Sequence, residues 1–302
     1  MNEEIYFDNN ERKKGLIAGV FFALVVGSAL FFAKTGLQYA NPFIILAWRF
    51  NFAFLSAFLI ALISYKNKKQ LLNFDKETLF IVFLYSTFLL LQTCGLMYST
   101  SIEGAIIFAV VPIIATIISN IVLKEKANLK QHICMVVSVS ALIYMIVSQS
   151  TEAHQVNLLG IFLLSISSVL VAISNVLMRK VRGKKKPFQL TFAIAFLGCI
   201  YINTVCGLAT GFDNYVEPIF EFEFLISVFY LGAFSITCSS LLSAYSLSKL
   251  SALEASIFGN LSTIISIILG ALILNEYFGL IQFVTSVVVI LSVIGISVWG
   301  KK

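Results

Sequence analysis

One stretch of the sequence occurs twice, and this duplication decides the fold. The first copy is EGAIIFAVVPIIATIISNIVLKEKANLKQHICMVV, residues 103–137, and the second is EASIFGNLSTIISIILGALILNEYFGLIQFVTSVV, residues 254–288. The copies share three polar positions, each 151 residues from its counterpart: Glu103 and Glu254, Glu125 and Glu276, and Gln131 and Gln282. The chain therefore contains one structural unit in two copies.

The composition of the chain places this unit in a membrane. Of the 302 residues, 59% are hydrophobic and 12% are charged, and the mean hydropathy is +0.95. A soluble globular domain is nearer half apolar and about a quarter charged. Long apolar runs recur along the whole chain, which predicts a helical integral membrane protein in a lipid bilayer. The first twelve residues are polar and Gly15 opens a full-length span, so no cleavable signal peptide is expected.

Ten apolar runs are long enough for a transmembrane helix, which needs about 20 residues. They cover roughly residues 15–33, 42–64, 78–98, 104–123, 131–149, 158–178, 188–209, 224–247, 253–274 and 279–299. Each copy of the repeated unit holds five runs, an odd number, so the second copy enters the membrane in the opposite direction. The predicted fold is all-α, an integral membrane protein with ten transmembrane helices in two inverted five-helix repeats. We expect a tail over residues 1–14, repeat 1 over 15–149, a connector over 150–157 and repeat 2 over 158–300.

Basic residues mark one side of this predicted topology. Of the 21 Lys and Arg residues, all but Lys34 and Arg49 fall in tails and connections on the same predicted side, while the connections of the other side are acidic. The positive-inside rule then places both termini in the cytoplasm and predicts a multi-pass protein of the cytoplasmic membrane. This distribution explains the formal net charge of +6 without a nucleic-acid partner, and a patch for anionic lipids is a weaker alternative.

The sequence lacks the residue sets that intramembrane enzymes require. All three aspartates lie outside the predicted spans, which excludes a protease with paired aspartates, and His132 and His154 fall near opposite membrane faces, which prevents a shared metal ion. No Walker A loop, G-x-S-x-G or H-E-x-x-H motif occurs, and the five cysteines lie in apolar segments without metal-ligand spacing. We predict no enzymatic activity, no cofactor and no metal site. Any uphill transport must then use a gradient, so a proton or another ion is the candidate coupling partner.

Polar side chains inside the spans are candidate substrate contacts, because such groups are costly in hydrocarbon and turn toward the bundle interior. They form stripes at helical spacing in the sixth, eighth and ninth spans. The candidates are Asn175 in the sixth span, Thr237 and Ser240 in the eighth, Asn260 and Thr263 in the ninth, and Gln92 in the third. The alternative is helix–helix packing through small and polar residues, which is also the role we expect for Gly19, Ala23 and Gly27 in the first span.

Arg49 is the one charge well inside a span. It lies seven residues after Pro42 and so about 10 Å along the helix. A charge at that depth is costly unless it is paired or hydrated. The functional hypothesis is that its guanidinium binds a carboxylate or phosphate of the substrate. The alternative is a structural arginine that holds backbone carbonyls or snorkels outward. Trp48 beside it is a further candidate contact, although an aromatic anchor at the membrane interface is its ordinary role.

Short motifs in both halves follow one another in a specific order and spacing. They are Gly27-Ser28…Lys34, Pro42…Arg49-Phe50, Tyr98-Ser99-Thr100…Glu103-Gly104-Ala105…Pro112…Leu123-Lys124-Glu125, and Ala244-Tyr245…Glu254-Ala255…Gly270…Asn275-Glu276…Gln282. This pattern resembles the EamA-type family of the drug/metabolite transporter superfamily, over nearly the whole chain from Gly15 onward. The family often has a proline in its ninth span, thirteen residues before the glutamate, where this chain has Thr263. Because only Pro112 is present, a symmetric pair of kinks is not expected.

The resemblance implies a ten-helix carrier, and most members resembling this chain export amino acids and related metabolites, while some import. We predict a secondary transporter that moves small polar metabolites, first of all amino acids or their relatives, by alternating access and in the direction of export. The alternatives are an importer of another small solute, such as a nucleotide-related compound or a quaternary amine, and a passive channel. Both a monomer and a homodimer remain open.

Overall fold

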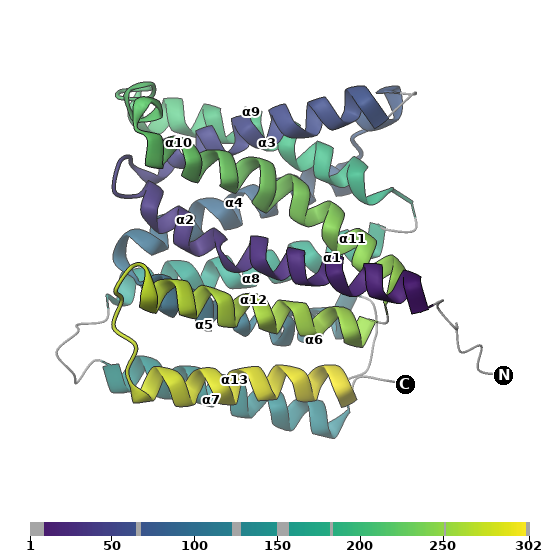
Figure 1. Ribbon diagram of the computed structural model, residues 1–302, viewed down its shortest axis with the longest axis vertical. Coiled ribbons are helices and arrows are strands. Elements are labelled where there is room, and N and C mark those ends of the chain that lie inside the picture. The colour runs from purple at the N-terminus through teal and green to yellow at the C-terminus, as the bar shows by residue number, and fades with distance from the viewer. Residues whose placement is uncertain are drawn as a thin grey trace.

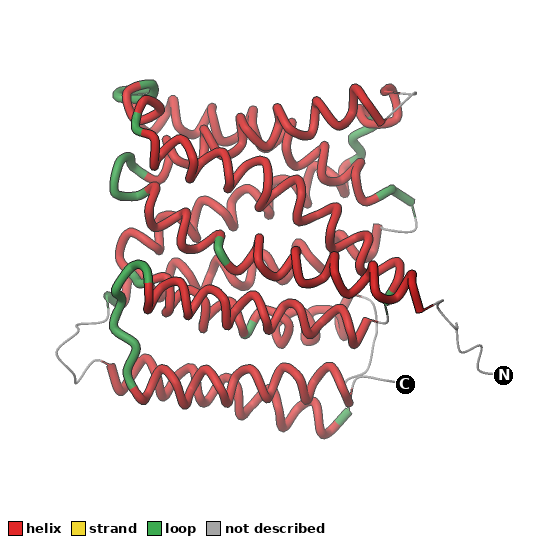
Figure 2. The backbone as a smooth tube through the Cα atoms, in the orientation of Figure 1, coloured by secondary structure: helices red, strands yellow, loops and turns green. Residues whose placement is uncertain are grey.

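The computed structural model describes residues 9–64, 68–122, 128–149, 157–181, 184–250 and 252–299. All regular structure in these ranges is helical, as Figure 2 shows, which confirms the predicted all-α class. The α-helices are α1 (Asn9–Gly27), α2 (Ala29–Gly36), α3 (Pro42–Ser64), α4 (Lys76–Tyr98), α5 (Ser101–Ala109), α6 (Val111–Val122), α7 (Leu129–Gln149), α8 (Leu158–Val181), α9 (Pro187–Thr210), α10 (Phe222–Phe229), α11 (Ser239–Lys249), α12 (Ala252–Leu272) and α13 (Leu280–Trp299). Two short 3₁₀-helices, η1 (Lys68–Leu72) and η2 (Glu217–Phe220), and one π-helical segment, η3 (Tyr230–Cys238), complete them.

The helices are long and apolar enough for a membrane. Seven segments of the described chain meet the length and hydropathy of a span, and α12 and α13 add the shorter apolar stretches Phe258–Leu272 and Leu280–Gly295. Large apolar side chains are exposed on their outer surfaces, as with Ile63 at 86% and Leu208 at 85%. Such surfaces match lipid rather than water. The chain is thus an all-α membrane protein, and the count of ten spans stays a prediction.

Polar residues set the ends of several helices. The Asp75 carboxylate caps α4 by accepting a hydrogen bond from the Thr78 backbone N–H over 2.9 Å. Thr100 and Glu103 form a capping box at the start of α5, in which each side chain accepts from the other residue's backbone N–H. Glu103 therefore acts as a cap of α5. After α9, Gly211 adopts a left-handed conformation with φ of 62° and ends the helix.

Three spans are interrupted inside the bundle. α1 and α2 meet at Ser28, whose hydroxyl donates back to the Leu24 carbonyl over 2.7 Å. α5 and α6 meet at Val110, just before Pro112, which has no backbone N–H to give. The third interruption is in the eighth predicted span, where α10 continues through the π-helical η3 into α11. α12 runs unbroken past Thr263, so the expected asymmetry between the two related spans is confirmed.

The first helices of the two predicted repeats run in opposite directions. At the end of α2, the Lys34 ammonium donates hydrogen bonds to the carbonyls of Leu96 and Ser99 at the end of α4, over 2.7 and 2.6 Å. α8 begins at the same place, because a Cβ added to Gly160 would lie 2.1 Å from Ser99 Oγ. Figure 1 shows α1 beginning and α13 ending at the other end of the bundle. We call the end where α1 begins the N-terminal face and the end where α8 begins the opposite face.

The packing of the helices follows the same duplication. α1 packs against α11 and α12, and α8 packs against α4 and α6. In the predicted repeats α1 corresponds to α8, α11 to α4, and α12 to α5 and α6. The contacts of α1 therefore correspond to the contacts of α8 in the other repeat. α3 packs against its counterpart α9, and α7 packs against its counterpart α13, as Figure 1 shows along one edge of the molecule. The arrangement therefore has an approximate two-fold relation between the halves.

Small residues on α1 allow α12 to approach closely. A Cβ at Gly19 would lie 2.1 Å from the Phe258 ring, and one at Gly27 would lie 2.7 Å from the Ser262 carbonyl oxygen. Ser266 on α12 also donates to the Gly27 carbonyl over 2.5 Å. Ala23 between them is fully buried. The structure thus confirms the close helix packing predicted for Gly19, Ala23 and Gly27.

Candidate functional site

The most unusual polar group in the bundle is Arg49 on α3. The residue is 4% exposed. Its Nη2 atom donates a hydrogen bond of 3.2 Å to the Ser235 hydroxyl on η3, and its Nε atom is buried without a partner. The Tyr85 side chain on α4 lies close enough to interact electrostatically with the guanidinium. Residues of three spans thus surround this cation: Arg49 on α3, Ser235 on η3 and Tyr85 on α4.

The π-helical segment brings η3 unusually close to α3. A Cβ at Gly232 would lie 2.3 Å from the Arg49 carbonyl oxygen and 2.7 Å from the Ala53 nitrogen, so this contact requires a glycine. Two residues of η3 form hydrogen bonds across the same contact: Ser235 with Arg49, and Thr237, which accepts from the Ser56 hydroxyl over 2.9 Å. π-helical turns inside α-helices often occur at functional sites. The two candidates Arg49 and Thr237 therefore lie along one helix–helix contact.

A second polar cluster lies beside Arg49 toward the opposite face. Trp48 donates from Nε1 to the Tyr215 carbonyl over 2.8 Å, and the two rings stack with centroids 5.2 Å apart. The Tyr215 hydroxyl accepts from Asn51 Nδ2 over 2.7 Å and donates to Asn203 Oδ1 over 2.8 Å, while Asn203 Nδ2 donates to Asn51 Oδ1 over 2.9 Å. Burial raises the pKa of Tyr215, opposed by the hydrogen bond from Asn51. This closed ring of hydrogen bonds fixes the connection after α9 onto α3.

The other predicted contacts are more scattered. Gln92 on α4 is buried and makes no side-chain hydrogen bond with the described residues, and the Asn260 amide nitrogen on α12 is buried without a partner. Asn175 on α8 is exposed. Ser240 donates to the Ile236 carbonyl of its own helix, and Thr263 donates to the Gly259 carbonyl. The structure thus joins Arg49 to Thr237 through the α3–η3 contact, and it does not join the remaining candidates to them.

Some residues of this region were missing from the sequence-based candidates. Ser235, Asn51 and Asn203 were not selected, although all three lie in predicted spans. The π-helical turn explains the first omission, because a stripe drawn at α-helical spacing loses its register there. Asn51 and Asn203 become recognisable only when α3 and α9 are placed side by side.

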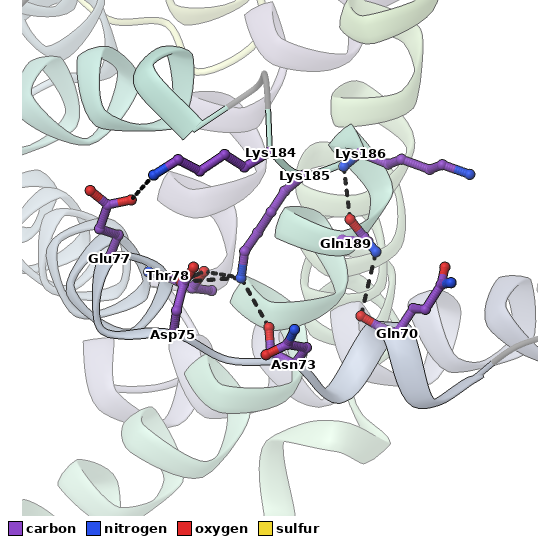
Figure 3. Close-up of polar contacts among 9 residues, drawn as sticks. All are labelled: Gln70, Asn73, Asp75, Glu77, Thr78, Lys184, Lys185, Lys186 and Gln189. Atoms are coloured by element: carbon purple, nitrogen blue, oxygen red, sulfur yellow. Dashed lines mark hydrogen bonds and ion pairs between the residues drawn. The ribbon is translucent and has the colours of Figure 1, made fainter.

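Contacts at the N-terminal face join the two halves. Lys185, in the connection before α9, donates to the Asn73 carbonyl and the Thr78 hydroxyl over 2.9 and 2.7 Å and forms an ion pair of 3.1 Å with Asp75, as Figure 3 shows. Lys184 forms a longer ion pair of 3.7 Å with Glu77. The hydrogen bond from the Thr78 hydroxyl, and to a lesser degree Lys185, lowers the pKa of Asp75 to about 2. A shallow pocket lined in part by Gln70, Phe74 and Gln189 opens beside this cluster, at the face rather than near Arg49.

A different set of contacts joins the halves at the opposite face. The Glu276 carboxylate, in the connection between α12 and α13, accepts hydrogen bonds from the Ser101 N–H, the Ser101 hydroxyl and the Ile102 N–H over 2.7, 2.7 and 3.0 Å. These donors form the start of α5, where a negative charge is favourable. Tyr39 also donates a hydrogen bond to Glu223 at this face. The counterpart of Glu276, Glu125, lies outside the described residues.

Comparison with known proteins gives the family. The EamA-like transporter family matches residues 13–147 and again residues 158–298, which is nearly the whole chain. The chain belongs to the EamA-like transporter family. It is 30% identical over 298 residues to the uncharacterized transporter YcxC of Bacillus subtilis, covering 97% of this chain and 96% of that protein. It is 25% identical over 251 residues to an uncharacterized transporter of Archaeoglobus fulgidus, covering 83% and 86%.

A solved crystal structure of another protein shares the fold. It aligns with a TM-score of 0.65 over 93% of this chain and 94% of that chain, at 13% sequence identity. At that identity the likeness concerns the fold alone. Together with the family match, the helices place this chain among multi-pass membrane transporters.

Proposed function

We propose that the chain is a secondary transporter that carries a small polar solute by alternating access, with amino acids or their relatives as the first substrate class and export as the direction. The observation that carries this proposal is a buried polar site between two halves whose first helices run in opposite directions. Membrane carriers of this architecture bind their substrates near the bilayer midplane, where the repeats meet.

The division of the chain supports the same mechanism. We assign repeat 1 to residues 15–149 and repeat 2 to residues 158–300, with a tail over 1–14 and a connector over 150–157. The two matches to the family, over residues 13–147 and 158–298, fit this division. With the N-terminal face in the cytoplasm, the basic cluster around Lys185 faces inward and the cap made by Glu276 faces outward.

The contacts at the two faces supply the gates that alternating access needs. Lys185 and Asp75 connect the halves at the N-terminal face, while Glu276 and Ser101 connect them at the opposite face. Each set consists of a few polar contacts at helix ends, so it can open without disrupting the apolar core. A carrier would break one set while it keeps the other, so that the solute reaches Arg49 from one side at a time.

The substrate contacts that we propose differ in how well they are placed. Arg49 and Thr237 lie along the α3–η3 contact, and Gln92 and Asn260 carry buried amides with hydrogen-bonding capacity to spare. Trp48, Asn175, Ser240 and Thr263 stay predictions. A proton or another ion remains the proposed coupling partner.

Counterflow in liposomes tests the proposal. Purified protein is reconstituted in vesicles loaded with one unlabelled amino acid, and uptake of the same labelled amino acid is followed for each member of a panel. A carrier gives saturable uptake that depends on the internal amino acid. Absence of uptake for every amino acid, by protein that is folded in the vesicles, would contradict the substrate class, and single-channel currents in a planar bilayer would favour a channel.

A further inference from the structure

Arg49 is a buried cation that has no acidic partner among the described residues. In the described part of the chain, its one hydrogen bond goes to the neutral hydroxyl of Ser235, and its Nε atom has no partner. None of the ion pairs found among the described residues includes Arg49. An unpaired charge in a low-dielectric interior is strongly unfavourable. The site is therefore electrostatically incomplete as it stands.

Four of the described acidic residues near the ends of the bundle are engaged elsewhere. Asp75 and Glu77 pair with lysines at the N-terminal face. Glu276 caps α5 at the opposite face, and Glu103 caps the same helix through its own capping box. These carboxylates hold helix ends in place, so they are poor candidates to neutralise Arg49.

One hydroxyl, that of Ser235, lies where it can share an anion with the guanidinium, and a second, that of Tyr85, lies on the neighbouring α4. The Ser235 oxygen accepts from Arg49, which leaves its own proton free to be donated. The Tyr85 hydroxyl lies within electrostatic range of Arg49 and makes no hydrogen bond with the described residues. A guanidinium with neighbouring hydroxyl donors is well suited to a carboxylate, which it can bind through two parallel hydrogen bonds.

We propose that Arg49 binds the carboxylate of the transported solute, with the Ser235 hydroxyl as a supporting donor. This inference rests on the proposed transport function. The charge of the site further restricts the class of solute, because one buried guanidinium balances one negative charge. This charge fits a carboxylate better than a doubly charged phosphate ester. The position of the site, between α3, α4 and η3 and about 10 Å along α3 from Pro42, favours a small solute over a lipid headgroup at the surface.

Thermal melting of the detergent-purified protein tests the anion site without any transport. Sodium acetate serves as the probe carboxylate and is compared with sodium chloride at equal ionic strength. We expect acetate to raise the melting temperature of the wild type. We expect Arg49→Met to melt at the same or a higher temperature than the wild type in chloride, because an unpaired charge has been removed, and to lose the acetate response.

Lys34→Met is the matched control for this experiment. The Lys34 ammonium is also partly buried, but it already has two carbonyl partners, Leu96 and Ser99, so its loss should lower the melting temperature. The inference is overturned if Arg49→Met melts as far below the wild type as Lys34→Met does, which would make Arg49 structural. It is also overturned if acetate acts equally on the wild type and on Arg49→Met.

Competition in the counterflow assay examines the same inference in the working transporter. An unlabelled amino acid should compete at least about tenfold better than its carboxamide, and Arg49→Gln should remove that preference. Equal competition by acid and amide in the wild type would contradict a carboxylate site. If no amino acid is carried at all, the substrate class of the proposed function fails, while the acetate measurement still decides whether Arg49 binds an anion.

Discussion

At the scale of the residue, the site depends on a glycine as much as on an arginine. Gly232 lets η3 lie against the backbone of α3, and this contact brings the Ser235 hydroxyl within 3.2 Å of Arg49. The neighbouring Trp48 forms a hydrogen bond and a ring contact with Tyr215. Two adjacent residues of α3 therefore have different contacts: Arg49 with η3, and Trp48 with the connection after α9.

Gly232→Ala should destabilise the protein. The new Cβ would lie 2.3 Å from the Arg49 carbonyl oxygen, so the two helices must separate, at a cost of about 1–3 kcal/mol. Gly259→Ala on α12 is the control, because a Cβ there meets nothing within 4 Å and alanine favours a helix by up to about 1 kcal/mol. In detergent, the melting temperature of Gly232→Ala should therefore lie below that of Gly259→Ala. Equal melting temperatures would contradict the proposed close contact.

At the scale of the element, the start of α4 combines a helix cap with a link between the halves. Asp75 accepts from the Thr78 N–H and also pairs with Lys185 from the other half. A conformational change that opens the N-terminal face can break the pair with Lys185 while the cap stays intact. The helix would then keep its length as the connection moves away.

Asp75 also predicts a pH dependence. Its pKa in the folded protein is about 2, below the ordinary value of 3.8, so its charge stabilises the fold above pH 4 and this contribution is lost as the pH falls through about 2. Asp75→Asn keeps a residue that can cap the helix but removes the charge. The melting temperature of the wild type should exceed that of Asp75→Asn by a constant amount from pH 8 to pH 5. This difference should decrease below pH 4. A difference that changes between pH 6 and pH 8 would point to another group.

The elements also show how far the sequence alone could lead. Hydropathy predicted a span over residues 42–64, and α3 covers Pro42–Ser64, because an apolar run must end where the chain leaves the hydrocarbon. The interruptions at Ser28 and in η3 were not predicted, since a local change of helical register leaves hydropathy unchanged. Arg49 could be selected by its depth in an apolar run. Its partner Ser235 could not, because that contact depends on which faces of two distant spans meet.

At the scale of the whole molecule, the two halves are related by packing as well as by sequence. α1 begins at the N-terminal face and α8 at the opposite face, and the contacts of each with its neighbours mirror those of the other. An approximate two-fold relation of this kind gives a carrier two similar-energy states, one open to each side. The buried Arg49 lies between the contacts that join the halves at the two faces.

The most direct test of this account is the side of the membrane from which each repeat begins. Lys13→Cys and Leu158→Cys place an exposed thiol near the start of α1 and of α8, in a background where the five native cysteines are replaced by alanine. On intact cells, a membrane-impermeant maleimide should label Leu158→Cys and leave Lys13→Cys unlabelled, and after permeabilisation it should label both. Equal labelling of the two positions on intact cells would contradict the inverted arrangement of the halves.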